Sequence, residues 1–399
     1  MILDFINTRE ELGQRNRRLV LAEILFKSPI PRAKIAERVG LTPASVSRIS
    51  RELLDAGLIE EGEEVALKNH RGRRFVGLRM KPSGCYVAGF ALNAFRQDIV
   101  VADLTNTPLA CHKIHFTDLS VPETVLAESA EQLNALIEET GIDRERLISC
   151  GIAVTGAVDP VACVLRSAPT LGWKDVEVGD IFRKRLGLPV FMENIPNAKN
   201  LAAHGFGPTK DVSNVVLINA SLGIGCSLLV DGRLVRGHEF NTGLLENLLI
   251  PQEDSSALCH LDEAAGGNAV IEYLRSNGKT VESSPTSALI KIIEQAAHNE
   301  DTAVKALRRA GRALAFAISA ANAFLNPETL LLSGPLVESP TYCNSVRERL
   351  TELVDEQFVQ DKLCVIPMSS HDAAQSLAIY QALVKGRVGS VIPTSKLEV

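Results

Sequence analysis

The sequence is poor in aromatic residues and has no apolar run of membrane-spanning length. Aromatic side chains make up 5% of its 399 residues, with a single tryptophan. No apolar stretch reaches the roughly 18 residues that a membrane helix needs. The first 14 residues, MILDFINTREELGQ, lack the basic and apolar regions of a signal peptide. We therefore expect a cytoplasmic protein.

The cysteines also lack a pattern that would indicate metal binding or a disulfide framework. The chain has eight, at positions 85, 111, 150, 163, 226, 259, 343 and 364, and no two form a CxxC pair. That spacing argues against a zinc ribbon. Because several lie in apolar, strand-like runs, we interpret them as buried, reduced thiols. No metal and no cofactor is expected.

The length and the charge distribution divide the chain. A chain of 399 residues favours two or three domains. The formal net charge is −6, but residues 1–80 carry 15 Lys plus Arg against 11 Asp plus Glu, and the remainder carries 27 against 37. A basic head, residues 1–80, thus precedes an acidic body. The head is the part that we expect to meet a polyanion.

The head has the periodicity of three short helices. Apolar spacing predicts a first helix over residues 8–27, with Pro29 and Pro31 ending it, and a second over residues 32–39, closed by Gly40. Thr42 is placed to cap a third helix. Proline at position 43, in the first turn, costs no hydrogen bond. Two short helices joined by a tight turn predict a helix-turn-helix.

The third helix, PASVSRISRELLD at residues 43–55, has two distinct faces. We expect its core face to comprise Val46, Ile49, Leu53 and Leu54, and its outward face to comprise Ala44, Ser45, Ser47, Arg48 and Arg51. Small residues near the helix start would let it enter a major groove. Arg48 could then reach a guanine edge, while the serine hydroxyls contact bases or phosphates.

Residues 56–80 read as two extended runs around a polar stretch, as in the wing of a winged helix. The basic cluster between them, Arg71-Gly72-Arg73-Arg74, could lie on phosphates or in a narrow minor groove. Viewed alone, such a cluster is also typical of a solvated turn. The predicted DNA contacts are Arg32, Lys34, Thr42, Ala44, Ser45, Ser47, Arg48, Arg51, Arg71, Arg73 and Arg74.

From Gly84 onward, strands alternate with long helices. Residues 86–116 predict three strands with tight turns, and a second hairpin-led unit begins at residue 214, with Asp231-Gly232 as a two-residue turn. Two such units indicate an internal duplication whose halves enclose a ligand cleft. We expect domains at residues 1–80, 81–200 and 201–370, with a helix at 371–387 returning to the second.

With these motifs in order, residues 10–385 resemble the ROK family, and specifically its branch of transcriptional repressors. The resemblance implies an α/β architecture: an N-terminal winged helix-turn-helix followed by a two-lobed, actin-like (ribonuclease H-like) sugar-kinase domain. In the kinases of the family, a DxGGT loop binds phosphate, an ExND segment supplies the general base and a GTGIG loop supports nucleotide.

The segments that match the kinase motifs depart from them at the positions that handle charge. The phosphate loop reads GFALNA at residues 89–94, so Ala91 replaces Asp and Asn93-Ala94 replace two glycines. The ExND segment reads ENIPN, and Ile195 occupies the position of the general base. An isoleucine cannot accept a proton. We therefore expect no phosphoryl transfer and no catalytic residues.

The sugar and zinc motifs of the family are also altered. GLLEN at residues 243–247 stands where the family has GExGH, so Leu244 replaces a sugar-contacting Glu and Asn247 replaces the His. Where the family has a zinc-binding CxCGxxGCxE cluster, residues 257–263 offer one thiol and one imidazole, too few for structural zinc.

Other elements of the family pattern persist. The glycines of Ser221–Gly225 match the GTGIG loop, and Ser333-Gly334-Pro335 resembles a late nucleotide-side turn. Residues 156–159 and 170–173 correspond to segments that approach sugar in relatives. The resemblance implies an effector pocket with these candidate residues: Thr170, Trp173, Glu193, Asn194, Asn247 and Asp262.

The favoured hypothesis is a repressor of carbohydrate-related genes, with a catalytically inactive kinase-like domain for effector binding and dimerisation. Its expected partners are double-stranded operator DNA, a sugar or sugar phosphate, and further copies of the chain as a homodimer or dimer of dimers. One alternative is an active ROK sugar kinase. A second is a regulator with no small-molecule effector. The apolar helix at residues 308–326 could serve the core or a dimer contact.

Overall fold

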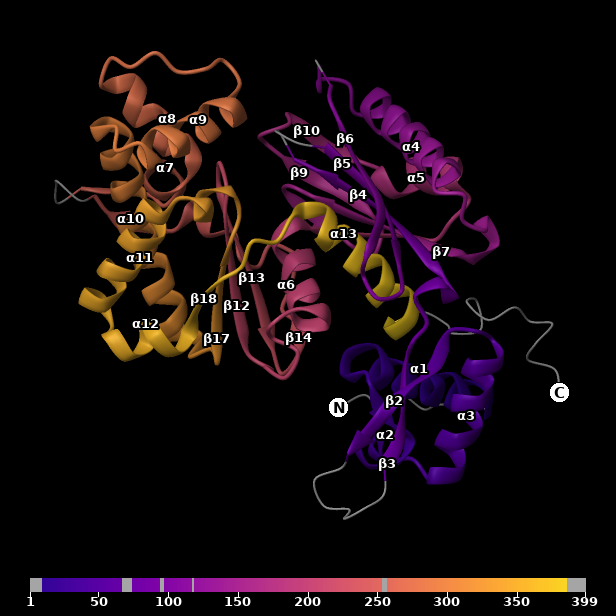
Figure 1. Cartoon of the computed structure of the whole chain (residues 1–399). Helices are drawn as coiled ribbons and strands as arrows, with labels where there is room; N and C mark the ends of the chain where they lie inside the picture. The colour runs from indigo at the N-terminus through magenta and orange to yellow at the C-terminus, as the bar shows by residue number, and fades with distance from the viewer. Residues whose placement is uncertain (1–8, 67–73, 94–96, 117, 253–256, 386–399) are drawn as a thin grey trace. The chain divides into compact units, whose positions relative to one another are not determined.

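The computed structural model describes residues 9–66, 74–93, 97–116, 118–252 and 257–385. The chain divides into two compact units (Figure 1). Unit 1 comprises Met1–Glu193 and Ala374–Val399, and unit 2 comprises Asn194–Ala373. The head and the first half of the body, together with the C-terminal segment, thus belong to one unit.

The head is a winged helix, as the sequence predicts. Gly40 ends the second helix with a left-handed φ of 67°, and Thr42 caps the third by accepting a hydrogen bond from Ser45 N at 3.2 Å. The predicted N-terminal residue of the first helix, Thr8, lies outside the described residues. The elements are α1 (Arg9–Lys27), β1 (Ile30–Pro31), α2 (Arg32–Val39), α3 (Pro43–Asp55), β2 (Ile59–Ala66) and β3 (Arg74–Met80), with β3 between β1 and β2 in an antiparallel sheet.

The rest of unit 1 is built on a five-stranded mixed sheet in the order β11-β7-β4-β5-β6. The three predicted hairpin strands pair antiparallel, and β7 lies parallel to β4. A small sheet of β8, β9 and β10 adjoins it. The bounds are β4 (Tyr86–Leu92), β5 (Gln97–Asp103), β6 (Pro108–Ile114), β7 (Leu147–Val154), β8 (Ala157–Asp159), β9 (Val164–Ala168), β10 (Trp173–Val176) and β11 (Val190–Asn194).

Side-chain alternation along β4 determines what covers each face of this sheet. Ala88, Phe90 and Leu92 belong to one core cluster with side chains of α4 (Pro122–Glu139) and α5 (Val178–Leu186). The Phe90 and Phe182 rings stack at 5.0 Å. Figure 1 shows α4 and α5 side by side along the sheet. Gly89, between Ala88 and Phe90 in β4, faces the opposite side of the sheet, toward α13 (Ser370–Tyr380).

Unit 2 repeats this topology. Its sheet has the order β14-β13-β12-β17-β18, with β13 antiparallel to the central strand β12 and β17 parallel to it. Asp231 and Gly232, with φ of 50° and 70°, form the predicted two-residue turn. The strands are β12 (Val215–Ala220), β13 (Ile224–Val230), β14 (Arg233–Leu234), β17 (Thr329–Ser333) and β18 (Leu363–Val365), and a separate hairpin is formed by β15 (Leu249–Pro251) and β16 (Leu258–His260).

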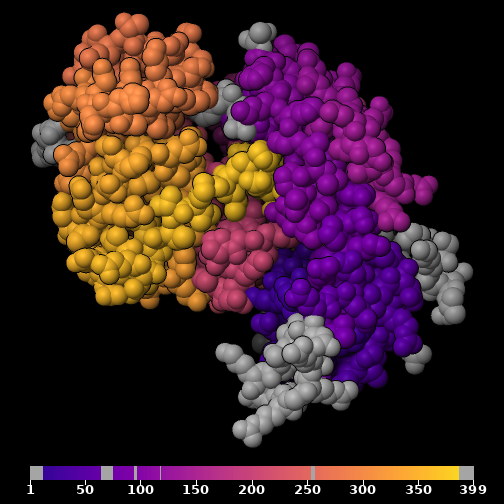
Figure 2. Space-filling model, viewed as in Figure 1, coloured from indigo at the N-terminus to yellow at the C-terminus, as the bar shows by residue number. Residues whose placement is uncertain are grey.

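Helices α7 to α12 of unit 2 are grouped together, orange to yellow in Figure 1 and Figure 2, while α6 lies apart from them in Figure 1. The long apolar helix α10 buries one face against its neighbours, which gives it the core role that the sequence left open. At its end, Phe324 is 88% exposed. Within the described residues, no helix is long and apolar enough to cross a membrane. The helices are α6 (Ile195–Phe206), α7 (Asp262–Ala265), α8 (Gly267–Ser276), α9 (Pro285–Ala297), α10 (Asp301–Leu325), α11 (Pro340–Leu353) and α12 (Glu356–Lys362).

A lysine lies buried in unit 2. Lys199 of α6 is 3% exposed, and its Nζ donates to Asn219 Oδ1 at 2.8 Å and to Ser333 Oγ at 3.3 Å. These two acceptors are paired in register on β12 and β17, so one side chain reaches both strands. Burial lowers the pKa of Lys199 to about 8, while the Asp372 carboxylate opposes the shift.

Lys199 should make stability depend on pH in the alkaline range. The unfolded chain holds the Lys199 proton up to a pKa near ~10.4, so protonation favours unfolding between the two pKa values. From pH 7 to 9 the free energy of unfolding of the wild type should rise by about 1 kcal/mol relative to Lys199→Met. Calorimetric unfolding of both proteins at each pH measures this difference.

The comparison with Lys199→Met is needed because buried thiols oppose the trend. Burial raises the pKa of Cys85 and Cys226 to about 12. The unfolded chain therefore loses these thiol protons before the folded chain does, and the free energy of unfolding falls as pH rises above roughly 8.5. That contribution is common to both proteins and cancels. An identical pH dependence for wild type and Lys199→Met would contradict the assignment.

Candidate nucleic-acid interface and effector site

Helix α3 presents two opposite stripes. Its buried side chains are Val46, Ile49, Ser50 and Leu53, while Leu54 is half-buried. Its exposed side chains include Ala44, Ser47, Arg48 and Arg51, at spacings of three and four residues that place them on one face, and Pro43 and Asp55 at its two ends are exposed as well. Of the other predicted contacts, Thr42 is exposed, and Ser45 is half-buried and accepts a hydrogen bond from the Thr42 hydroxyl at 2.9 Å.

The basic side chains of the head differ in their partners. Arg48 pairs with Glu52 one turn along α3, and Glu52 also accepts from Arg17 Nε of α1 at 2.8 Å. On α2, Arg32 and Lys34 lie 2.9 Å from the carboxylates of Glu61 and Glu37, respectively. Arg51 has no ion-pair partner within the described part of the chain. Arg51 therefore contributes an unpaired charge to the exposed stripe.

Of the three arginines predicted as DNA contacts of the wing, the described part of the chain includes only Arg74. Strands β2 and β3 pair from Ile59↔Met80 to Ala66↔Arg74, with an irregularity between Glu61 and Glu64. Arg71 and Arg73 lie outside the described residues, and Arg74 opens β3. Arg79, on the same strand, is paired with Glu60 at 2.7 Å.

Three predicted effector residues belong to unit 1. Trp173 is 3% exposed within the hydrophobic core, and its indole N–H donates to the Leu119 carbonyl at 2.6 Å. An indole has a single donor, so Trp173 has none left for a ligand. Glu193 is 2% exposed at the end of β11, and Thr170 is exposed in the turn before β10.

The other three belong to unit 2. Asn194 caps α6, its Oδ1 accepting from Asn197 N at 2.9 Å, and the next residue is Ile195, 5% exposed. Asn247 is exposed. Asp262 accepts a hydrogen bond from Ile224 N at 2.6 Å, within the glycine-containing loop that joins β12 to β13. Asp262 thus occupies a backbone donor of the loop that resembles GTGIG.

The glycines of that loop make room for the chain's own side chains. A Cβ on Gly223 would lie 2.8 Å from an Asp262 carboxylate oxygen, and a Cβ on Gly225 would lie 2.6 Å from Pro196 Cγ. Burial raises the pKa of Asp262. It also raises the pKa of Glu246, to which the Asp262 charge adds. Sequence reasoning missed Glu246, although it stands next to the predicted Asn247.

A carboxylate on the neighbouring strand lies opposite Ala91. Ala91 is fully buried in β4, and the register places Asp98 of β5 opposite it, 1% exposed. Residues opposite each other in an antiparallel pair share a face. Sequence reasoning missed this neighbour, because the register of the two strands depends on the length of the turn between them. Of the predicted replacements for the loop glycines, Asn93 is half-buried and Ala94 lies outside the described residues.

The segment compared with a zinc site offers little for a metal. Cys259 is half-buried with its Sγ 3.9 Å from the Ile250 carbonyl oxygen, and His260 is exposed. Among the described residues, no group of three or more His, Cys, Asp and Glu side chains is arranged to hold a metal ion.

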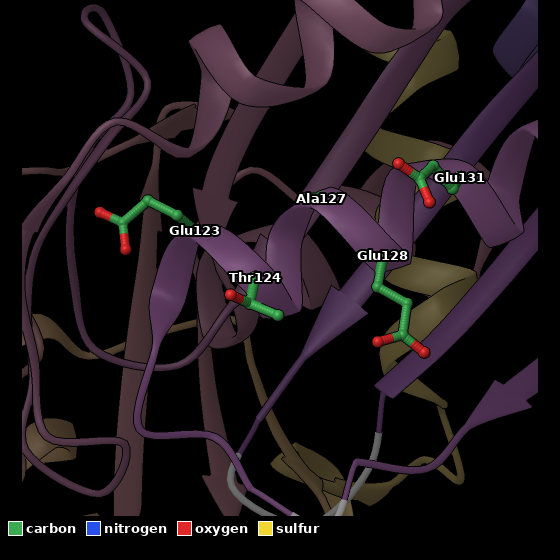
Figure 3. Close-up of a pocket in the computed structure, with 5 residues that line it drawn as sticks. All are labelled: Glu123, Thr124, Ala127, Glu128 and Glu131. Carbon is green, nitrogen blue, oxygen red and sulfur yellow. The ribbon is translucent and has the colours of Figure 1, made fainter.

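A hollow on α4 is unsuited to anions. It is lined by Glu123, Thr124, Ala127, Glu128 and Glu131 (Figure 3). Figure 3 shows the Glu123 and Glu128 carboxylates pointing in opposite directions, so they do not converge on one ligand. None of the predicted effector residues lines this hollow.

Comparison with family models matches residues 95–385 to the ROK family and residues 8–72 to a Crp-like helix-turn-helix domain. The chain is 26% identical over 348 residues to a xylose repressor of Bacillus spizizenii, covering 86% of this chain and 88% of the relative. It is also 26% identical over 324 residues to the DNA-binding transcriptional dual regulator NagC of Escherichia coli, covering 78% of each.

Solved structures share the fold. A ROK family transcriptional regulator, described as a homolog of the E. coli MLC protein, superposes with a TM-score of 0.77 at 26% identity, over 96% of this chain and 99% of that one. A ROK family glucokinase from Streptomyces griseus superposes with a TM-score of 0.61 at 18% identity, over 73% and 98%. Since the matching family model covers well over half of the sequence, the chain belongs to the ROK family.

Proposed function

We propose that this chain is a DNA-binding repressor of carbohydrate-related genes that reads its operator with α3. The observation that carries the proposal is the exposed stripe of Ala44, Ser47, Arg48 and Arg51, opposite the buried stripe that fixes the helix in the head. Small side chains and two arginines suit a major groove. The similarity to a xylose repressor and to NagC supports this function.

Arg48 is free to exchange its partner on binding. Its side chain is 59% exposed, and an exposed ion pair contributes about 0–1 kcal/mol, so leaving Glu52 costs little. Arg17 stays beside Glu52 and retains part of its charge balance. A bidentate contact with guanine contributes ~1–3 kcal/mol of discrimination and outweighs the lost pair.

The body acts in this proposal without phosphoryl transfer. Ile195 stands at the position of the family's general base, and Asp262 occupies an amide of the glycine loop. An apolar side chain cannot take the proton of a sugar hydroxyl. The alternative of an active sugar kinase is supported by the shared fold of the glucokinase and by Asp98 beside Ala91, but neither supplies the missing base.

A neutral sugar fits unit 2 better than a sugar phosphate. Asp262 and Glu246 lie close enough for the charge of one to raise the pKa of the other, and both accept hydrogen bonds when ionised. Sugar hydroxyls donate to such groups, whereas a phosphate would be repelled. The relative named for xylose supports a sugar as the effector class. Effector binding would change operator affinity by about 5- to 150-fold, the usual range of coupling.

Selection from random double-stranded DNA with the full-length protein tests the proposed function. We expect enrichment of a near-palindromic sequence with two half-sites about one helical turn apart. Arg48→Ala should lose preference at one base position per half-site, at a cost of roughly 1–3 kcal/mol in affinity. Arg275→Ala, which removes an exposed arginine of α8 in unit 2, should select the wild-type sequence. An unenriched pool from the wild type would refute the function.

Thermal unfolding with a panel of sugars and sugar phosphates tests the effector. A neutral sugar should raise Tm by mass action, and Asp262→Asn should reduce that shift while Asp301→Asn, an exposed residue at the start of α10 in unit 2, keeps it. If no compound shifts the wild type while operator binding persists, the regulator works without a small-molecule effector. A shift by sugar phosphates alone would contradict the assignment of Asp262 and Glu246.

A further inference from the structure

The described residues of unit 1 show two sets of contacts between the head and the remainder of the unit. One is the short connector Lys81–Cys85, which contains the 3-10 turn Pro82–Gly84. The other joins α1 to the π-helical turn Gln381–Lys385, which continues α13.

The connector is packed tightly on both sides. A Cβ on Gly84 would lie 2.7 Å from the Gly57 carbonyl oxygen in the head and 3.3 Å from Leu104 Cδ1 in the body. Lys81 N donates to Leu58 O at 2.9 Å, and Arg146 Nη1 donates to Ser83 O at 3.0 Å. These distances leave no room for a larger side chain at Gly84, so the connector holds the head to the body at one point.

The C-terminal contact holds the opposite side of the head. The Phe26 ring of α1 stacks on the Tyr380 ring of α13 at 6.2 Å, with 30° between the planes. Arg18 Nη1 donates to the Lys385 carbonyl at 3.2 Å. The last carbonyls of a helix have no partner in the helix, and a cation there also interacts favourably with the helix dipole.

Helix α13 is in turn fixed to the central sheet of unit 1. A Cβ on Gly151 would lie 2.1 Å from the Ala374 carbonyl oxygen, and a Cβ on Gly89 would lie 3.1 Å from Gln375 N. Ser149 Oγ donates to Ala378 O at 3.2 Å, and Gln375 Nε2 donates to Asn106 O at 2.8 Å. Glycines on two strands thus let the helix backbone lie directly on the sheet, which leaves it little freedom to shift.

Helix α1 connects this contact with the DNA-reading helix. Arg17 binds Glu52 of α3 at 2.8 Å, and its neighbour Arg18 binds the end of α13. The turn that receives Arg18 is π-helical, a rare form that is frequent at functional sites. Sheet, α13, α1 and α3 are therefore joined by successive packed or hydrogen-bonded contacts.

We propose that the joint formed by Phe26, Tyr380, Arg18 and Lys385 fixes the orientation of the head and thereby sets the operator spacing that the protein accepts. A head held only at the connector could rotate to follow half-sites at several distances. A second contact removes that rotation, so the two heads of a dimer fit one spacing. These are positioning residues that do not touch DNA, and the inference rests on the proposed function.

The test measures affinity for the selected operator and for versions with one to four base pairs added between the half-sites. The wild type should lose roughly 100-fold in affinity when the spacing changes, because only one head then engages. Tyr380→Ala and Arg18→Gln should lose less than about tenfold. Leu12→Ala, an exposed residue of α1 away from the joint, should behave as the wild type.

Affinity for a single half-site separates this role from a merely structural one. It should be unchanged in all variants, because α3 keeps its surface. Tyr380→Ala and Arg18→Gln with the spacing preference of the wild type would overturn the inference and leave the proposed function intact. If Tyr380→Ala does not fold, the surface variant Arg18→Gln decides the result alone. A wild type that binds no sequence selectively overturns the proposed function itself.

Discussion

The approach of α13 to the sheet of unit 1 is the constraint on which the arrangement of that unit depends. Gly89 and Gly151 have no side chains, so the helix backbone lies close on β4 and β7, and a Cβ on Gly151 would lie only 2.1 Å from the Ala374 carbonyl oxygen. Because α13 is fixed there, Tyr380 and the turn that follows it contact α1 of the head at a fixed position. The C-terminal end of the sequence thus contributes to the placement of its N-terminal domain.

The second unit keeps the fold of the family while its own side chains fill the loop after β12. The loop after β12 keeps Gly223 and Gly225, yet the space beside them holds Asp262 and Pro196, and Asp262 accepts a hydrogen bond from the Ile224 amide. Ile195 begins α6 where the family's kinases carry a base, and Lys199 of the same helix bonds to β12 and β17. These contacts stabilise the fold from within, which agrees with our proposal that the body serves as a scaffold and sensor.

Much of the fold could be predicted, because its signals are local. Helical periodicity and caps located α2 and α3, and Asp231-Gly232 located a hairpin turn. Long-range pairing could not be read in this way. Asp98 beside Ala91 depends on strand register, and the Phe26–Tyr380 contact joins residues from opposite ends of the chain. The indole of Trp173 belongs to the hydrophobic core, and the motif alone could not predict this, since burial of one residue depends on the whole sheet.

The central claim is that the ROK body of this chain holds and directs a DNA-reading head and does not transfer phosphate. Its most direct test is a steady-state assay of nucleotide-dependent phosphorylation, with the purified chain, ATP, Mg²⁺ and a panel of hexoses, pentoses and N-acylhexosamines, beside an active ROK glucokinase as the positive control. The account predicts no sugar phosphate above the enzyme-free background. Sustained turnover that Asp98→Asn abolishes would contradict it.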